Sequence, residues 1–280
     1  MTLRVSIVAA GSMGSGIAQR LGEHGATVLT SLTGRSEASA KRAEAAGMRA
    51  VDGAQLMQAD LFLSIVPPGE ALALARRFAP LLERANKKPV YVDCNAVNPQ
   101  TISRIGEVVT ATGAKFVAAG IIGPPPKPGS TNTKLYVSGP AAQDVAVLND
   151  YGLIVRVLDG PLTAAAALKM SYAGITKGFT ALAAAMMLAA TRGGSAEALK
   201  AELAESQLPL QNWLNRQVPS MYGKAYRWVA ELDEIAGFVG EEFPEHAMFN
   251  ASARLYERIA ADLDGRKDEI DILDTFVHKP

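Results

Sequence analysis

The sequence predicts an α/β protein in which a doubly wound parallel sheet is followed by an all-α C-terminal domain. Short apolar runs alternate with amphipathic stretches as far as residue 159, and glycines or prolines mark many of the changes. No strand-like run follows residue 160. A chain of 280 residues, 49 % of them hydrophobic, is long enough to form two cores. We therefore expect an α/β domain over residues 1–159 and a helical domain over residues 160–280.

The strands of the first domain are predicted from runs of apolar and β-branched residues. In chain order they are Arg4–Ala10, Thr27–Leu32, Arg49–Val51, Leu61–Val66, Val90–Cys94, Lys115–Ile121 and Lys134–Ser138. Glycines at 25 and 47 stop the first two helices, and a proline at position 99 begins the last. The helices expected between the strands are Gly14–His24, Ser36–Ala46, Asp52–Met57, Gly69–Leu82 and Pro99–Thr112. Repeated βα units of this length are typical of a Rossmann-type sheet with helices on both faces.

The second domain is predicted to be helical throughout. It opens with Leu162–Arg192, a run that is apolar nearly all round and therefore suits a helix buried between domains or subunits. The helices expected after it are Ala196–Glu205, Leu210–Gln217, Lys224–Val239, Glu245–Asp262 and Arg266–Phe276. The long first helix has too few neighbours to cover it, so we expect a homodimer in which a second copy completes the core.

Composition excludes several classes of function. Lysine plus arginine equals aspartate plus glutamate, so the formal net charge is zero and nothing global attracts nucleic acid or an anionic membrane. The single cysteine, Cys94, permits no intrachain disulfide. The longest apolar run, Phe179–Ala190, is too short to span a bilayer. No Cys, His or carboxylate spacing suggests a metal site. We expect a cytoplasmic protein that acts on a small molecule and binds neither nucleic acid nor membrane.

A glycine-rich turn links the first strand to the first helix. Residues 9–14 match the dinucleotide pattern G-x-G-x-x-G, with alanine in the first place. The first turn of the helix would meet a pyrophosphate with free N–H groups. The alternative is a tight βα turn without a ligand. The residues expected to bind the cofactor here are Ala10, Gly11, Ser12, Met13 and Gly14.

The end of the second strand indicates which nucleotide binds. An NAD site usually has a carboxylate near this position, but residues 31–36 contain no acid before Glu37. Arg35 suits a 2′-phosphate, with Thr33 and Ser36 as hydrogen-bond donors, so we favour NADP (NADPH) over NAD. The alternative is that Arg35 is a solvated loop charge. The ends of the fourth and fifth predicted strands lie at the same edge of the sheet. The residues expected to bind the cofactor there are Val66, Pro67, Pro68 and Asn95.

These features together resemble the β-hydroxyacid dehydrogenases, a superfamily that includes 6-phosphogluconate and 3-hydroxyisobutyrate dehydrogenases and the imine reductases. The resemblance covers residues 4 to about 177. It depends on Gly11-Ser12-Met13-Gly14, Val66-Pro67-Pro68, the segment Asp93–Pro99 and a lysine on the first long helix, Lys169. The C-terminal segments Lys169–Gly178 and Trp228–Ile235 are similar to a poorly characterised branch of 6-phosphogluconate dehydrogenase-like proteins.

The resemblance implies hydride transfer between nicotinamide and a carbon that bears a hydroxyl, carbonyl or imine. It also implies that Lys169 assists the reaction. The usual Asp-x-Ser-Thr substrate turn is replaced by Asp93-Cys94-Asn95-Ala96, and the usual pair of asparagines after the lysine by Tyr172 and Ala173. The glycine-rich substrate loop corresponds to residues 120–126. These departures alter the residues that, by the resemblance, hold the carboxylate of the family's familiar substrates.

The residues themselves also point to the long helix. At about 100° per residue, Lys169, Tyr172, Thr176 and Thr180 lie on one stripe, with Lys177 at its edge. Desolvation favours the neutral form of a buried lysine, which suits proton transfer to or from a substrate oxygen. Lys169 and Tyr172 are therefore the predicted catalytic residues, and the substrate is expected to contact Asn95, Ala96, Gly123, Pro124, Thr176 and Lys177.

Several interpretations stay open at this point. Lys169 could instead pair with Glu231 or Glu234, and Lys177 suits a substrate or phosphate contact as well as a structural one. Cys94 has no histidine placed to activate it, so we expect it to pack in the core. The favoured function is an NADP-dependent oxidoreductase of small hydroxy or keto acids. The alternatives are an imine reductase and a non-catalytic sensor of NADPH.

Overall fold

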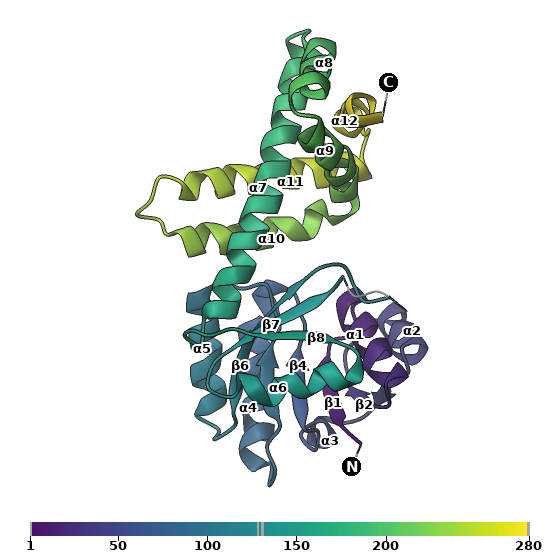
Figure 1. Cartoon of the computed structure of the whole chain (residues 1–280). Coiled ribbons are helices and arrows are strands. Elements are labelled where there is room, and N and C mark those ends of the chain that lie inside the picture. The colour runs from purple at the N-terminus through teal and green to yellow at the C-terminus, as the bar shows by residue number, and fades with distance from the viewer. Residues whose placement is uncertain (1, 128, 130–131, 279–280) are drawn as a thin grey trace. The chain divides into compact units, whose positions relative to one another are not determined.

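The protein contains an eight-stranded sheet and an all-helical region (Figure 1). The computed structural model describes residues 2–127, 129 and 132–278. The chain divides into two units, Met1–Met170 (unit 1) and Ser171–Pro280 (unit 2). The change of unit falls within a long helix, whereas the sequence pattern places the domain boundary at residues 159/160.

The sheet has the strand order β3-β2-β1-β4-β5-β6-β7-β8. Its first six strands are parallel, which is the doubly wound arrangement that the sequence predicts. The strands are β1 (Arg4–Val8), β2 (Thr27–Thr30), β3 (Arg49–Ala50), β4 (Leu61–Ser64), β5 (Val90–Asp93), β6 (Phe116–Ile122), β7 (Lys134–Ser138) and β8 (Ile154–Val157).

One pair departs from the parallel arrangement, because β7 runs antiparallel to β6. The connection between them, residues 123–133, contains no helix among its described residues and is short for the crossover that a parallel pair needs. Strand β8, which the sequence analysis missed, follows a helical crossover and is again parallel to β7. Its sequence, three β-branched residues and Arg156, does carry a strand signal, although the strand is only four residues long and Arg156 and Val157 are exposed.

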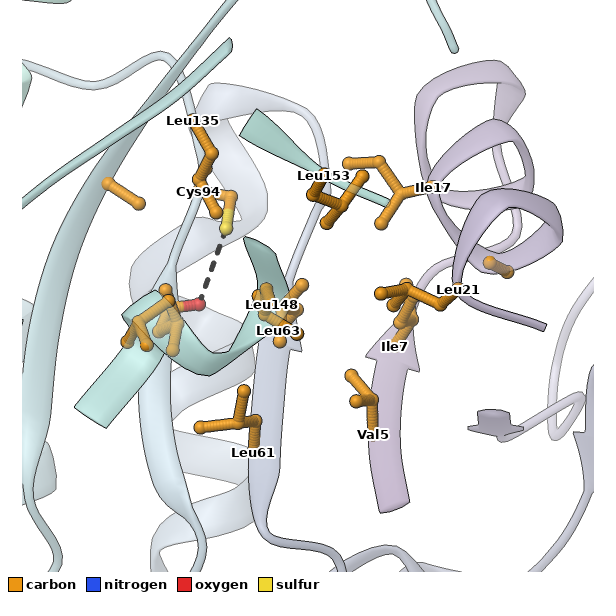
Figure 2. Close-up of a cluster of buried hydrophobic side chains, with 14 of the residues drawn as sticks. Val5, Ile7, Ile17, Leu21, Leu61, Leu63, Cys94, Leu135, Leu148 and Leu153 are labelled. Atoms are coloured by element: carbon orange, nitrogen blue, oxygen red, sulfur yellow. Dashed lines mark hydrogen bonds between the residues drawn. The ribbon is translucent and has the colours of Figure 1, made fainter. Parts of the chain in front are cut away.

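Helices cover both faces of the sheet. They are α1 (Ser12–Glu23), α2 (Glu37–Ala45), α3 (Gly53–Leu56), α4 (Ala71–Arg84), α5 (Pro99–Thr110) and α6 (Ala142–Val145), with 3₁₀ turns η1 (Pro68–Glu70) and η2 (Ala146–Tyr151). One core cluster joins one face of the sheet to α1 and η2 through residues such as Ile17, Leu21 and Leu148 (Figure 2). A second cluster joins the other face to α4 and α5 through Phe78 and Ile102.

Cys94 belongs to the first core cluster, as the sequence analysis expects. Its thiol is buried and donates a long hydrogen bond to the Val92 carbonyl oxygen, 3.8 Å away (Figure 2). Burial and the neighbouring Asp93 raise the pKa of this thiol well above its usual value. Cys94 is therefore a packing residue and not a nucleophile.

Unit 2 contains most of a long helix and five that follow it. The helices are α7 (Ala164–Arg192), α8 (Ala196–Ser206), α9 (Leu208–Met221), α10 (Ala225–Val239), α11 (His246–Asp264) and α12 (Asp268–His278), with the 3₁₀ turn η3 (Tyr222–Lys224). Most boundaries lie within two residues of those expected. Helix α9 continues through Pro219 to Met221 because Val218 and Met221 are fully buried, and packing outweighs the missing backbone donor.

Helix α7 packs against the hairpin of α10 and α11 through two glycines. A Cβ atom at Gly174 would lie 3.3 Å from the Ile235 side chain, and one at Gly178 would lie 3.3 Å from Phe249. By length and composition α7 is the one helix of the described residues that could cross a membrane, but 44 % of its most apolar window is buried in the protein. A single helix of this kind is weak evidence for a membrane span, since core helices share its properties.

Candidate functional site

The turn between β1 and α1 has the geometry of a phosphate cradle. Gly11 is the N-cap of α1 and no side chain caps the helix, and a Cβ atom at Gly11 would meet nothing within 4 Å. A Cβ atom at Gly14 would overlap the Ala9 carbonyl oxygen. Residue 14 must therefore be glycine for the helix to approach the strand, and Gly11 leaves open space in front of the first N–H groups of the helix.

The remaining residues of the cradle divide between the core and the surface. Ala10 is buried and Met13 packs against the first core cluster, whereas Ser12 is exposed at the first position of α1. The described residues therefore present the backbone of the turn and the Ser12 hydroxyl to a ligand, which suits a pyrophosphate.

The loop after β2 contains the residues predicted to select the nucleotide. The Arg35 backbone N–H donates to the Leu32 carbonyl at 3.0 Å, which closes a turn with Thr33 exposed. The Ser36 hydroxyl caps α2 by accepting from the Ser39 N–H at 3.3 Å. The Arg35 guanidinium makes no hydrogen bond or ion pair with the part of the chain that the structure describes, so it is available to an anion.

Sequence reasoning missed a second arginine beside this loop. Arg42, in the last turn of α2, donates from Nε to the Ala10 carbonyl oxygen at 3.1 Å. It also donates from Nη2 to the Ser39 hydroxyl at 2.9 Å. Arg42 lies beyond residues 31–37, where the pattern for nucleotide selection is found, and its one signal in the sequence is its spacing of three residues from Ser39 on one helical face.

The ends of β4 and β5 are joined by Asn95. Its Oδ1 accepts from the Val66 N–H at 2.6 Å, and its Nδ2 donates to the Ser64 hydroxyl at 2.7 Å. It also donates through Nδ2 and its backbone N–H to the two carboxylate oxygens of Asp93, both at 3.0 Å. Both side-chain donors of Asn95 are therefore used inside the protein, and its main role in the structure is to position the Val66 loop.

Asp93 is a fully buried acid beneath this loop. Burial raises the pKa of its carboxyl to about 7, although the two hydrogen bonds from Asn95 act in the opposite direction. The same face of β5 carries Tyr91, whose pKa is raised by burial and by the charge of Asp93. Among the other predicted residues, Pro67 is exposed, while Val66, Pro68 and Ala96 are half-buried.

Lys169 lies at the end of β6. Its Nζ donates to the Ile121 carbonyl oxygen at 2.9 Å. The close approach depends on Gly120, because a Cβ atom there would lie 2.8 Å from the Ala165 carbonyl oxygen and 3.1 Å from the Cβ of Lys169. Since β6 is parallel to β5, the ammonium lies at the same sheet edge as the cradle and the Asn95 loop.

The loop after β6 packs on α1. Gly123 has φ +123°, and a Cβ atom there would overlap the Asn132 carbonyl oxygen. The Pro124 carbonyl accepts from the Thr133 hydroxyl. Further along, the Pro126 ring approaches Gly16, and the Arg20 guanidinium donates to the Lys127 carbonyl at 2.6 Å. The described part of this loop is therefore held over the helix that begins at the cradle; residues 128, 130 and 131 lie outside the described residues.

The rest of the predicted stripe on α7 belongs to unit 2. Tyr172 is exposed, and the hydroxyls of Thr176 and Thr180 donate to the carbonyl oxygens of Tyr172 and Thr176, one helical turn earlier. Lys177 is buried and forms an ion pair with Glu231. These contacts support the structural interpretation of Lys177. No group of three potential metal ligands occurs in the residues that the structure describes.

Comparison with known proteins identifies the two parts of the chain. Residues 4–148 match the NAD binding domain of 6-phosphogluconate dehydrogenase, and residues 190–259 match a domain of unknown function, DUF1932. The structure is similar to that of the conserved protein MTH1747, whose function is unknown and which resembles 3-hydroxyacid dehydrogenases. The identity is 26 %, the TM-score is 0.73, and the match covers 97 % of this chain and 99 % of that one.

Two enzymes share the fold at lower identity. The 3-hydroxyisobutyrate dehydrogenase of Salmonella typhimurium is 17 % identical with a TM-score of 0.71, covering 97 % of this chain and 99 % of that one. The reductive aminase of Aspergillus terreus, solved with NADPH and ethyl levulinate, is 17 % identical with a TM-score of 0.57, covering 99 % and 100 %. At this identity the likeness concerns the fold alone.

Proposed function

Since the chain belongs to the family of dehydrogenases and reductases that share the NAD binding domain of 6-phosphogluconate dehydrogenase, we propose that it is an NADP-dependent oxidoreductase. It is proposed to act in the cytoplasm on a small hydroxy or keto acid. The observation that carries this proposal is the place of Lys169. Its ammonium is held at the Ile121 carbonyl, on the sheet edge that also carries the glycine cradle. Ligands of doubly wound sheets bind at this edge.

The cradle accounts for the cofactor. Gly11 leaves room in front of the helix N-terminus, and Gly14 allows the helix to approach β1. NADPH is proposed over NADH because Arg35 stands where an NAD site has an acid, with its guanidinium unengaged by the described residues. The A. terreus relative binds NADPH. Val66, Pro67 and Pro68 follow β4, where the Asn95 side chain holds the loop next to the cradle.

Lys169 is the proposed proton donor and acceptor. A bound NADPH would supply the hydride, and Lys169 would protonate the substrate oxygen as it gains charge. The lysine is half-buried, and its Nζ is directed to the sheet edge by the hydrogen bond to the Ile121 carbonyl oxygen. Tyr172, three residues further along α7, offers an exposed phenol as a second donor or as a group that orients the substrate.

The substrate is proposed to lie beside Lys169 at the ends of β5 and β6. Asn95, Ala96, Gly123 and Pro124 follow these strands, and most of them offer backbone groups, because the Asn95 side-chain donors are engaged. Thr176 and Lys177 were also expected to contact substrate. The Thr176 hydroxyl and the Lys177 ammonium already bond within unit 2. We therefore propose that backbone groups of unit 1 make most of the contacts with the substrate.

An imine reductase is the alternative. It shares the hydride donor and the proton donor, and differs in reducing C=N. The reductive aminase relative and the phenol of Tyr172 favour it. A sensor that binds NADPH without turnover is the third possibility, but such a protein has no need of a lysine held at the end of β6.

The test is a titration followed by a turnover assay. NADPH and NADH are titrated by fluorescence against the wild type and Arg35→Ala; we expect tighter binding of NADPH, and loss of the preference in the variant. Turnover is then measured with hydroxy acids, keto acids and imines. Lys169→Met should abolish turnover with NADPH binding intact, whereas the surface variant Lys134→Met should retain it. Absence of binding of either nucleotide would overturn the proposal.

We also propose that two copies of the chain associate through an exposed apolar face of α7. Five side chains form this face, here named the α7 seam, and are 39–72 % exposed: Tyr172, Ile175, Phe179, Leu182 and Met186. They recur at alternating steps of three and four residues, the spacing of a coiled-coil seam. Tyr172 and Met186 are equidistant from Phe179, so an antiparallel second copy would meet the seam with its own. The seam has no charged residue that would select a different partner.

A further inference from the structure

We propose that Arg42 is a second cation of the nucleotide site and that it binds the 2′-phosphate of NADPH together with Arg35. The proposal rests on the function proposed above and deepens it, because it assigns cofactor selection to a residue outside the β2 loop. It depends on where Arg42 is held, on which of its donors are used, and on the charges around it.

Two hydrogen bonds hold the Arg42 side chain beside the glycine turn of the cradle. Nε donates to the carbonyl oxygen of Ala10, the residue before Gly11, and Nη2 donates to the Ser39 hydroxyl. Ala10 lies 32 residues earlier in the chain, so this contact joins the last turn of α2 to the glycine turn. The guanidinium thereby lies beside the glycine turn and beside Ser39, whose hydroxyl is 3.2 Å from that of Ser36 at the end of the loop that carries Arg35.

Most donors of this guanidinium remain free for a ligand. An arginine has five N–H donors, and the bonds to Ala10 and Ser39 engage one on Nε and one on Nη2. Arg42 is exposed and forms no other hydrogen bond or ion pair within the described residues. A planar pair of N–H groups is the preferred partner of a phosphate, because it donates two parallel bonds.

The charges nearby leave the site positive. The first acid after β2, Glu37, forms an ion pair with Lys41 at 2.7 Å and so does not oppose the arginines. The Ser36 and Ser39 hydroxyls are 3.2 Å apart, and Ser39 accepts from Arg42. Arg42, the Ser36 and Ser39 hydroxyls, and Arg35, the residue before Ser36, suit a phosphate dianion, and none of these four side chains is the carboxylate that usually holds a free ribose 2′-hydroxyl.

The competing interpretation is that Arg42 is a structural residue that only connects α2 to the cradle. A structural residue would affect the binding of every nucleotide equally, whereas a phosphate-binding residue would affect only nucleotides that have a 2′-phosphate. This difference makes the two roles separable by binding alone, without any turnover.

The experiment uses four ligands and three variants of the full-length protein. NADPH, NADH, adenosine 2′,5′-bisphosphate and adenosine 5′-monophosphate are titrated by calorimetry against the wild type, Arg42→Ala and Arg42→Gln. Glutamine is neutral but keeps a donor that can reach the Ala10 carbonyl. Arg49→Ala, which removes an exposed arginine from the adjacent strand β3, is the matched control. Thermal midpoints verify that each variant is folded.

We expect both Arg42 variants to bind NADPH and the bisphosphate roughly 10- to 100-fold more weakly, the usual effect of losing a hydrogen-bonded charge. Binding of NADH and the monophosphate should be unchanged, as should all binding by Arg49→Ala. An equal loss of affinity for all four ligands would identify Arg42 as a structural residue and overturn the proposal. No loss of affinity for any ligand would overturn it as well. If the wild type binds NADPH but Arg42→Gln behaves like it, only this inference fails. If the wild type binds neither NADPH nor NADH, the proposed function fails with it.

Discussion

Lys177 and Glu231 form a buried ion pair inside unit 2, with the Lys177 ammonium 5.3 Å from the centre of the Trp228 ring. Their side chains are only 10 % and 16 % exposed. The Tyr256 hydroxyl donates to the Lys177 backbone carbonyl at 2.6 Å, so the pair joins α7 to α10 and α11 at one point. A charge in this position depends on its partner, because water cannot replace it.

Removal of the Glu231 charge should destabilise the protein strongly. Glu231→Gln leaves the Lys177 ammonium buried without its counterion, and we expect the free energy of unfolding to fall by about 3–5 kcal/mol in urea denaturation. The double variant Lys177→Met/Glu231→Leu should recover most of this loss. The exposed pair of Arg254 and Glu257 is the control, where Glu257→Gln should change stability by about 1 kcal/mol or less. An effect of Glu231→Gln as small as the control would show that the pair is well solvated.

Asp93 should make stability depend on pH. Its carboxyl pKa is about 7 in the folded protein and 3.8 in the reference state, so between these values the folded protein binds a proton that the unfolded chain has lost. Stability from this group is therefore largest below about pH 4 and decreases as pH rises towards 7. The steepest slope is about 1.4 kcal/mol per pH unit. Urea denaturation from pH 4 to 8 measures it.

The matched variant for Asp93 is Asp93→Asn, which cannot ionise. Other carboxyls contribute slopes of their own, so the informative quantity is the difference between wild type and variant. The difference should fall as pH rises, and parallel curves for the two proteins would contradict the raised pKa.

The two cradle glycines should respond differently to alanine. Gly14→Ala places a Cβ on the Ala9 carbonyl oxygen, so we expect about 1–3 kcal/mol of destabilisation and weaker nucleotide binding. Gly11→Ala meets nothing within 4 Å and has an ordinary backbone conformation, so its thermal midpoint should be preserved. Its methyl group would still occupy the space proposed for the pyrophosphate. Normal binding by a stable Gly11→Ala protein would count against that placement.

The α7 seam should control association. We expect light scattering to give the mass of two chains for the wild type and of one chain for Leu182→Glu, because a charge on the seam would be buried in the dimer. Leu208→Glu is the control, since Leu208 is similarly exposed but lies on α9, outside the seam. A wild-type mass of one chain, or a dimer unaffected by Leu182→Glu, would be contrary to this prediction.

Most of the secondary structure was predictable because it depends on neighbours in the sequence. Most helices and strands lie within about two residues of the bounds expected from apolar, β-branched runs, the helical period of 3.6, the glycines after α1 and α2, and the proline at the start of α5. The exceptions are α6 and β8, which were not expected, and α9, which ends four residues later than expected. The cradle was predictable for the same reason, since a strand, a glycine turn and a helix follow one another without a gap. Lys169 was found through its place on the long helix and through the resemblance to a family.

The tertiary structure decided the contacts between distant parts of the chain. Strand β7 runs antiparallel to β6, and the described residues of their connection contain no crossover helix. The Asn95 side chain bonds to the Val66 N–H across 29 residues, and Lys177 pairs with Glu231 across 54. Arg42 reaches the Ala10 carbonyl only because α2 packs against α1, the helix that follows the cradle. Local patterns determine which elements form, whereas packing and the need to satisfy every buried polar group determine which of them meet. The sequence by itself therefore determined the elements and the cradle, and the fold decided which side chains remain free to act.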